Sequence, residues 1–209
     1  MKEFFAKKDE LEKTYFNKLI SMEPSSSVVL FLCTISTYCK EKFYNLEMLE
    51  QNKSELMDHI MKGLIRVKSI PQASDISGCS IVFRAISKDE FKSVILPVLQ
   101  RPMLRSPEVI LRAVGAIVSE IQADLSDFAT DLGKTLIQNL ASKDKTVRQE
   151  AVESLKQVAL KCGESKAIEA LLKEIFAVLN GSGGKITVIE LRINLLQVRH
   201  FLFACLFHT

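Results

Sequence analysis

The chain has 209 residues, of which 47% are hydrophobic and 25% charged, and its formal net charge is +3. These values are typical of a globular protein and not of a disordered one, and the length is sufficient to bury a sizeable core. The charge total is too small to indicate a nucleic-acid binder by itself. No apolar run approaches the ~20 residues of a membrane span, and the first residues lack a signal-peptide pattern, so we expect no membrane association.

Apolar residues recur at three- and four-residue steps through most of the chain, which predicts helices and no strands. Pro97 lies inside one predicted helix and should bend it. Ser106 is predicted to cap the next helix, with Pro107 in its first position. The predicted helices cover residues 9–21, 28–41, 46–66, 73–86, 89–100, 107–122, two segments within 126–162, residues 165–179, and a last segment that begins near Ile186.

The most regular stretch is 126–162, which reads as two amphipathic helices joined by a tight polar turn. The first carries an apolar stripe on one face, and the second carries another. Neither helix can bury its stripe alone, so the pair requires a neighbour on each side. The stripes consist of Leu125, Phe128, Ala129, Leu132, Leu136 and Leu140, then Val147, Ala151, Leu155, Val158 and Cys162.

The first helices of successive pairs begin near residues 9, 48, 89, 126 and 165, a spacing of about 40 residues that is typical of a HEAT-type solenoid. The turn at Asp144 carries the repeat signature, in which Asp144 caps the second helix and Arg148 is expected to reach the adjacent unit. Ile110 stands where the preceding unit would need an arginine, which excludes a continuous arginine ladder. We therefore predict an all-α, right-handed HEAT/armadillo-type α-solenoid of about five helix pairs, with 1–197 as a single segment.

No constellation of residues with catalytic or metal-binding spacing is found. The five cysteines include no Cys-x-x-Cys pair, and their number is odd, so we interpret them as reduced core thiols of a cytosolic protein. The glycine loop at 180–184 lacks the spacing of a nucleotide-binding loop and is interpreted as a turn with a helix C-cap. We predict no enzyme activity, cofactor, metal or small-molecule substrate. The residues weighed as nucleophiles or metal ligands are the cysteines and histidines, namely Cys33, Cys39, Cys79, Cys162 and Cys205, with His59, His200 and His208.

Charge is distributed unevenly between the two kinds of turn. In a solenoid, the turns within pairs line one edge, here called the within-pair edge, and the turns between pairs line the other, the between-pair edge. The within-pair edge is predicted to be basic and to follow an RNA backbone, although charged, solvated turns are also what any solenoid shows. The between-pair edge is predicted to be acidic, with Asp89, Glu90, Asp124, Asp127 and Glu164, although Lys88 and Lys166 also lie there. The basic set is Arg66, Lys68, Arg101, Arg105, Lys143, Lys145 and Lys185.

Two segments resemble a known family. These are DEFKSVILPVLQRPMLRSPEVIL (89–111) and FAVLNGSGGKITV (176–188), on either side of the regular hairpin. The sequence is similar, over roughly 9–197, to the N-terminal part of the general control non-derepressible protein one family. That family comprises ribosome-associated HEAT-repeat translational activators of the amino-acid-starvation kinase that phosphorylates initiation factor two alpha.

The resemblance implies a non-catalytic scaffold in the cytoplasm that binds ribosomes and polysomes. It also implies that the kinase is reached only through regions of the family that are absent from this chain. An alternative is a general protein-binding HEAT adaptor of the transport or phosphatase-scaffold type, which would bind an acidic peptide in a concave groove.

The resemblance stops at Gln197. The remaining residues, 198–209, form a divergent apolar tail that begins with Val198-Arg199, the pair that a translated splice-donor sequence would give. We interpret the tail as intron read-through, with a natural final helix as the alternative. A spliced transcript junction inside 198–209 would rule out read-through. In either case we expect the tail to expose an apolar helix face.

Overall fold

The computed structural model describes residues 18, 21–22, 57–58, 60–62, 65, 79–84, 86–181 and 189–206. Within these ranges all regular structure is helical and no strand occurs. The predicted helices at 9–21, 28–41 and 46–66 lie outside the described residues apart from a few positions, and so does half of the predicted helix at 73–86. The helices described below all lie between residues 80 and 206.

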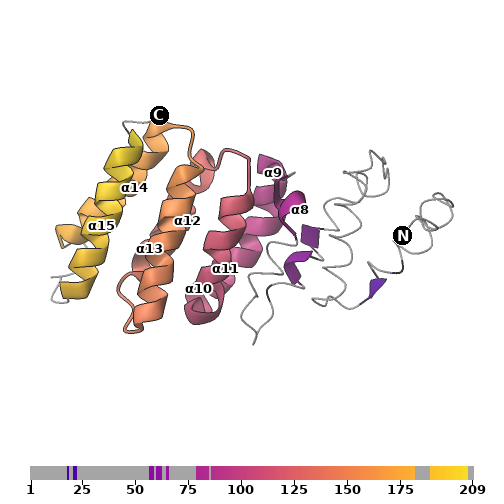
Figure 1. The fold of residues 1–209 in the computed structure, drawn as a ribbon, viewed down its shortest axis with the longest axis horizontal. Helices are drawn as coiled ribbons and strands as arrows, with labels where there is room; N and C mark the ends of the chain where they lie inside the picture. Colours follow the sequence, from indigo (N-terminus) through magenta and orange to yellow (C-terminus); the bar gives the residue numbers. More distant parts are fainter. Residues whose placement is uncertain are drawn as a thin grey trace.

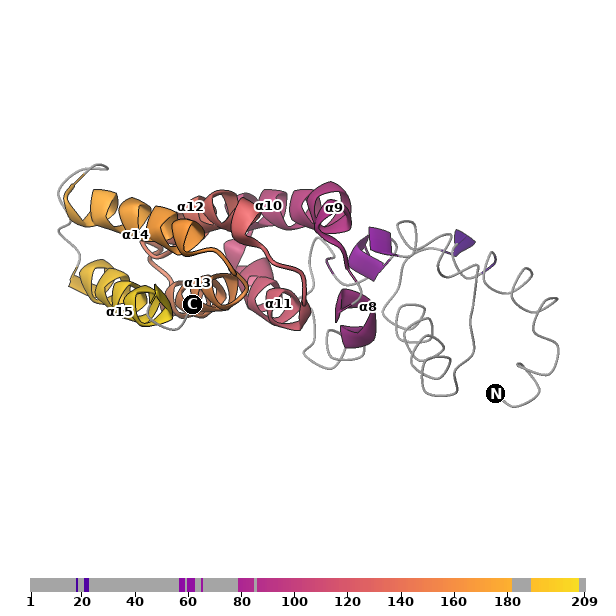
Figure 2. The same cartoon turned by 90° about the horizontal axis from the view of Figure 1, so that it is seen from above.

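The described helices form antiparallel pairs stacked in two layers (Figures 1 and 2). Helices α10, α12 and α14 form one layer, and α11, α13 and α15 form the other. This arrangement confirms the predicted all-α solenoid. The elements are α8 (Ser80–Arg84), α9 (Lys88–Glu90), the π-helical turn η2 (Phe91–Ile95), α10 (Leu96–Arg105), α11 (Pro107–Glu120), the 3-10 turn η3 (Ser126–Phe128), α12 (Ala129–Asn139), α13 (Lys145–Leu160), α14 (Ser165–Leu179) and α15 (Ile189–Leu206).

The hairpin of α12 and α13 buries both of its predicted stripes. Leu132 and Leu136 of α12 and Ala151 and Leu155 of α13 are completely buried. The two helices also pack on their neighbours, α12 on α10 and α14, and α13 on α11 and α15. The core is therefore continuous along the stack, as expected for units that cannot bury their apolar faces alone.

Close approaches between neighbouring units depend on glycine. A Cβ atom added at Gly133 of α12 would lie 2.2 Å from Cδ2 of the buried Leu171 of α14. A Cβ at Gly115 of α11 would lie 3.1 Å from the hydroxyl oxygen of Ser154 of α13. The Ser154 hydroxyl donates a buried hydrogen bond to the carbonyl of Leu111 at 2.9 Å, which satisfies the only polar group on that side chain.

The helix predicted at 89–100 differs from the prediction in two places, its carboxyl end and the turn before Pro97. It does not end at Gln100 but continues through Pro102 to Arg105. Ahead of Pro97 the chain widens into the π turn η2, in which the Leu96 amide donates to the carbonyl of Phe91. Proline lacks an amide hydrogen and its ring crowds the carbonyl four residues earlier, so a wider turn accommodates Pro97 without ending the helix.

Helix starts follow the sequence signals in part. Asp144 caps α13 as predicted, because its Oδ1 accepts hydrogen bonds from the amides of Thr146 at 2.7 Å and Val147 at 3.4 Å. Ser106 occupies the cap position of α11 and Pro107 begins the helix, as predicted, but the Ser106 side chain makes no capping hydrogen bond. Its backbone (φ −145°, ψ 58°) lies outside the extended region from which a cap side chain reaches the helix amides.

Helix α15 runs without interruption from Ile189 through Gln197 to Leu206. Val198 and Leu202 are buried, whereas Ile193 and Phe203 remain 48% and 38% exposed. The helix is therefore apolar on both its packed and its open side. The boundary at 197 and the read-through origin of the tail stay predictions. In the part of the chain that the structure describes, no helix has the length and apolarity needed to cross a bilayer.

Truncation of the central core residue of the hairpin should destabilise the fold. Leu155 is completely buried on α13, so Leu155→Ala should lower the free energy of unfolding by about 2–5 kcal/mol through lost burial and the cavity left behind. The matched control is Leu160→Ala on the same helix, where the side chain is 58% exposed. Urea denaturation followed by circular dichroism would measure both, and equal losses would contradict this packing.

Candidate functional site

Four of the seven predicted basic residues lie among the described residues, and all four are exposed. Arg101 and Arg105 occupy the last turns of α10, Lys143 lies in the turn between α12 and α13, and Lys145 is the first residue of α13. Among the residues that the structure describes, none of the four has a carboxylate within ion-pair distance. Their positive charge is therefore uncompensated. The remaining three, Arg66, Lys68 and Lys185, lie outside the described residues.

Topology places these four cations at one end of the helices. The carboxyl end of α10 and the α12–α13 turn lie at the lower side of the stack in Figure 1, opposite the α11–α12 and α13–α14 turns. The chain crosses from α10 to α11 at Ser106 alone, so Arg101 and Arg105 belong to a helix end and not to a loop. Their binding of RNA stays a prediction.

Arg148 stabilises the turn that presents Lys143 and Lys145. Its guanidinium donates from Nη1 to the carbonyls of Ser142 and Lys143, both at 2.9 Å. The expectation that Arg148 reaches the adjacent unit is therefore wrong. A side chain in the first turn of a helix leans toward the amino end of that helix, which here is the turn of its own unit.

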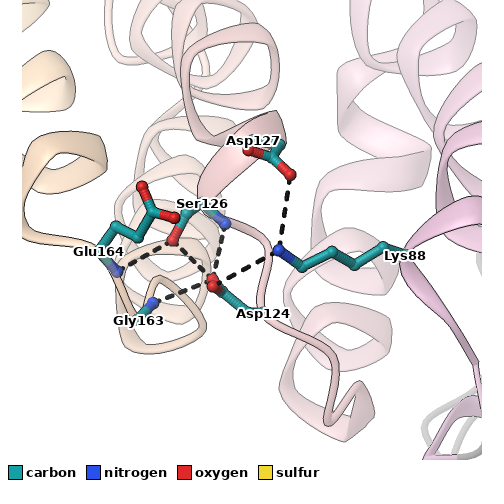
Figure 3. Close-up of polar contacts among 6 residues, drawn as sticks. All are labelled: Lys88, Asp124, Ser126, Asp127, Gly163 and Glu164. Atoms are coloured by element: carbon teal, nitrogen blue, oxygen red, sulfur yellow. Dashed lines mark hydrogen bonds and ion pairs between the residues drawn. The ribbon is translucent and has the colours of Figure 1, made fainter.

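The most connected polar cluster of the described region lies on the between-pair edge and centres on Asp124 (Figure 3). Oδ1 of Asp124 accepts hydrogen bonds from the amide of Ser126 at 2.9 Å, the hydroxyl of Ser126 at 2.6 Å and the amide of Gly163 at 3.0 Å. The Ser126 hydroxyl in turn accepts from the amide of Glu164 at 3.0 Å. Two consecutive between-pair turns are thus joined through two side chains.

Lys88 brings the start of the preceding pair into the same cluster. Its ammonium lies 3.6 Å from Asp124 and 3.5 Å from Asp127 (Figure 3). The carboxylate of Glu90 accepts hydrogen bonds from the amide and the hydroxyl of Ser87, which closes a capping box on α9. Lys88 therefore neutralises part of the predicted negative charge of this edge, and the carboxylates of Glu90 and Asp124 accept local hydrogen bonds.

The carboxyl of Asp124 is held in its ionised form. Partial burial acts to raise its pKa, but the amide of Gly163, the hydroxyl and amide of Ser126 and the ammonium of Lys88 outweigh burial and lower the pKa from 3.8 to about 2. For Lys88, burial acts to lower the pKa, and the carboxylates of Asp124 and Asp127 raise it overall. Both partners are therefore charged at neutral pH.

The described thiols show no sign of activation. Cys162 is buried, and burial, with Asp124 and Cys205 nearby, raises its pKa to about 12. A thiol of this kind is an inert core group, because the thiolate is the nucleophilic form. Among the described residues no three His, Cys, Asp or Glu side chains gather in an arrangement suited to a metal ion. Cys33, Cys39, His59 and His208 lie outside the described residues.

The glycine loop begins as a helix C-cap, as predicted. Gly181 adopts a positive φ of 88°, and its amide donates to the carbonyl of Val178 at 3.0 Å. The other residues of the loop, 182–188, lie outside the described residues.

A shallow depression of about 190 Å³ opens between α11 and α13 on the second layer. Its floor is formed by small side chains, and its rim carries one guanidinium and two carboxylates. Neither composition nor periodicity indicated it beforehand. It is lined by Arg112, Gly115, Ala116, Ser119, Glu150, Glu153, Ser154 and Gln157.

Comparison with known proteins gives one family. The family model described as "Stalled ribosome sensor GCN1 N-terminal" matches residues 53–186. Proteins named Stalled ribosome sensor GCN1 from Mus musculus and Homo sapiens are each 33% identical to this chain over 187 residues. The aligned part covers 90% of this chain and 7% of each relative.

A plant relative is more distant. Protein ILITYHIA of Arabidopsis thaliana is 27% identical over 151 residues, which cover 72% of this chain and 6% of that protein. The chain thus spans only about 7% of the length of the curated relatives it matches most extensively. No solved structure was found to match it.

The pKa of Asp124 gives a pH test. Because its folded pKa of about 2 lies below the ordinary value of 3.8, its contribution to stability is complete above the ordinary value and is lost as the pH falls through about 2. We expect the melting temperature of Asp124→Asn to fall less steeply with acidification than that of the wild type. Asp131→Asn, at an exposed carboxylate of α12, is the control and should parallel the wild type. Parallel curves for all three proteins would contradict the assignment.

Proposed function

The chain belongs to the family of the stalled ribosome sensor GCN1 N-terminal region, and on that premise we propose that it is a non-catalytic scaffold segment that helps its protein bind ribosomes. The observation that carries the proposal is the set of four exposed and unpaired cations on the within-pair edge. All four, Arg101, Arg105, Lys143 and Lys145, fall inside the residues matched by the family model. The relatives are named as sensors of stalled ribosomes, and ribosomes present phosphate backbones on their surface.

The physical basis is counterion release. An RNA backbone carries a row of negative charges with condensed cations, and each phosphate neutralised by lysine or arginine releases one of them. Arginine can bind a phosphate through two parallel hydrogen bonds, whereas lysine acts as a point charge. Two consecutive helix pairs each supply two cations to the same edge, so a backbone that follows this edge would meet two basic groups in succession.

The proposal assigns the chain one part of a larger activity. We infer a cytoplasmic, ribosome-associated location from the relatives' names. Activation of the starvation-responsive kinase, which the family resemblance implies, is assigned to other parts of the long relatives. The absence of catalysis is supported by the buried, high-pKa thiol of Cys162 and by a family named for sensing.

Charge reversal at the within-pair edge should abolish ribosome or RNA co-sedimentation. In the variant Arg101→Glu, Arg105→Glu, Lys143→Glu, Lys145→Glu, we expect loss of binding in low salt. For any residual binding, the plot of log affinity against log salt concentration should become shallower by about 3 to 4 in slope. Four phosphate contacts would be lost, and each releases roughly 0.7 to 0.9 counterions.

The matched control reverses four cations away from the within-pair edge. In Lys92→Glu, Lys161→Glu, Lys166→Glu, Lys173→Glu the net charge is identical, but the side chains lie along helices or at the between-pair edge. Three of them are exposed and Lys161 is half-buried. Lys134 is left unchanged because it pairs with Glu174. This control should retain most of the binding. Unchanged sedimentation of the within-pair variant in low salt would overturn the proposal, and equal loss in both variants would reduce it to an effect of net charge.

The second candidate function is a protein-binding adaptor, favoured by the depression between α11 and α13. Exposed Arg112 on its rim could accept a carboxylate from an acidic peptide. Arg112→Glu should then weaken capture of an acidic peptide and leave ribosome sedimentation intact. Polysome profiles of the tagged chain, recorded with and without amino-acid starvation, separate the two functions, because an adaptor of this kind would stay in the light fractions.

A further inference from the structure

The links between neighbouring helix pairs are concentrated on one edge of the array. On the between-pair edge, the amide of Leu125 donates to the carbonyl of Lys161 at 2.8 Å, in addition to the bonds around Asp124 and Ser126. The guanidinium of Arg84, at the end of α8, donates to the carboxylate of Glu120, at the end of α11, at 2.9 and 3.1 Å. Every between-pair turn of the described region is thus tied to another by polar contacts.

Apolar contact reinforces the same edge. The rings of Phe91 and Phe128 begin the first helices of two successive pairs, and their centroids lie 5.1 Å apart. Both side chains are buried. The two rings are tilted by 46° and add to the polar contacts there, since an aromatic pair at this distance is attractive beyond its buried area.

The within-pair edge is tied far less. In the described part of the chain, its one hydrogen bond between units runs from the side-chain amide of Asn139 to the carbonyl of Met103 at 3.3 Å. The turn at Lys143 is held by Arg148 and Asp144, which belong to its own unit. The middle of the stack contributes the Ser154–Leu111 bond and the ion pair between Lys134 of α12 and Glu174 of α14, at 3.6 Å. Among the described residues, the polar contacts between units therefore become fewer from one edge to the other.

We infer that the between-pair edge is the hinge line of this array, and that the array bends by opening and closing the within-pair edge. The side chains of Asp124 and Ser126, which join the two between-pair turns, are called the clasp. Bending would change the distance between the Arg101–Arg105 group and the Lys143–Lys145 group while the clasp keeps its geometry. This deepens the proposed function: the basic edge adjusts its charge spacing to the RNA backbone it meets.

The clasp is built to persist at physiological pH. The lowered pKa of Asp124 and the raised pKa of Lys88 keep both groups ionised, so neither the ion pair nor the amide contacts are lost near neutrality. Motion is then taken up where the contacts are fewest, since regions with few inter-unit contacts open at the lowest free-energy cost.

Distance measurements on the free chain would test the hinge. Spin labels are introduced through unnatural amino acids at four exposed positions. Labels at Gln122 and Glu164 report on the between-pair edge, and labels at Leu104 and Thr146 report on the within-pair edge. We expect a narrow distance distribution for the first pair and a broader one for the second. Equal widths at the two edges would overturn the inference.

Variants of two turn aspartates separate the clasp from ordinary capping. Asp124→Ala should raise amide exchange at Gly163 roughly tenfold, as expected for loss of its charge-assisted hydrogen bond to Asp124, and broaden the 122–164 distance distribution. Asp144→Ala removes only the cap of α13 and should change neither readout. If Asp124→Ala fails to fold, Asp124→Asn is the second variant, because it keeps an acceptor oxygen but loses the charge opposite Lys88. It should still broaden the 122–164 distance distribution. An unchanged width in a folded variant would refute the clasp.

An RNA duplex added to the labelled chain tests the link to function. Narrowing of the 104–146 distribution on binding supports adjustment of the basic edge, and an unchanged distribution with RNA bound overturns it. If no RNA binds while the two edges still differ in width, the ribosome-binding proposal fails and the hinge stands.

Discussion

The described helix pairs hold together because their helices are apolar on more than one side. Helix α13 buries Ala151 and Leu155 and also contacts α11, α12 and α15, so it cannot be satisfied by its own partner alone. The same constraint explains the glycines at 115 and 133, which let neighbouring units approach until Ser154 and Leu171 fill the space. Stacking is therefore the source of stability, and the edges, where helices end, are left to polar chemistry.

The sequence predicts the stack well because its causes are local and periodic. Apolar steps of three and four residues located the α12–α13 hairpin, and the ~40-residue spacing agrees with bonds between units whose partners lie 36 to 43 residues apart. The Asp124 clasp could not be predicted in this way, because it depends on which turns meet in space. Its signals are an Asp-x-Ser turn at 124–126 and a glycine 39 residues later, which are common in loops. The failed cap at Ser106 and the local role of Arg148 likewise depend on backbone angles that composition does not determine.

The two edges use charge in different ways. On the between-pair edge the cation Lys88 is balanced by two carboxylates, so charge there serves cohesion. On the within-pair edge Arg105 and Lys143 are not balanced in the described region, so charge there is available to a partner. Membership of the family rests on the match over 53–186 and not on these charges.

The within-pair turns differ from one another in length more than the between-pair turns do. The within-pair connections range from the single residue Ser106 to the residues 140–144, and a longer segment follows Leu179 before α15 begins at Ile189. The between-pair turns at 121–125 and 161–164 have nearly equal lengths of five and four residues, and both are held in register by Asp124 and Ser126. One residue added at 121–125 would misalign three units at once, whereas one added at 140–144 would lengthen only a local loop. The edge that presents the unpaired cations is therefore the one at which a longer loop would leave the stacking of the units unchanged.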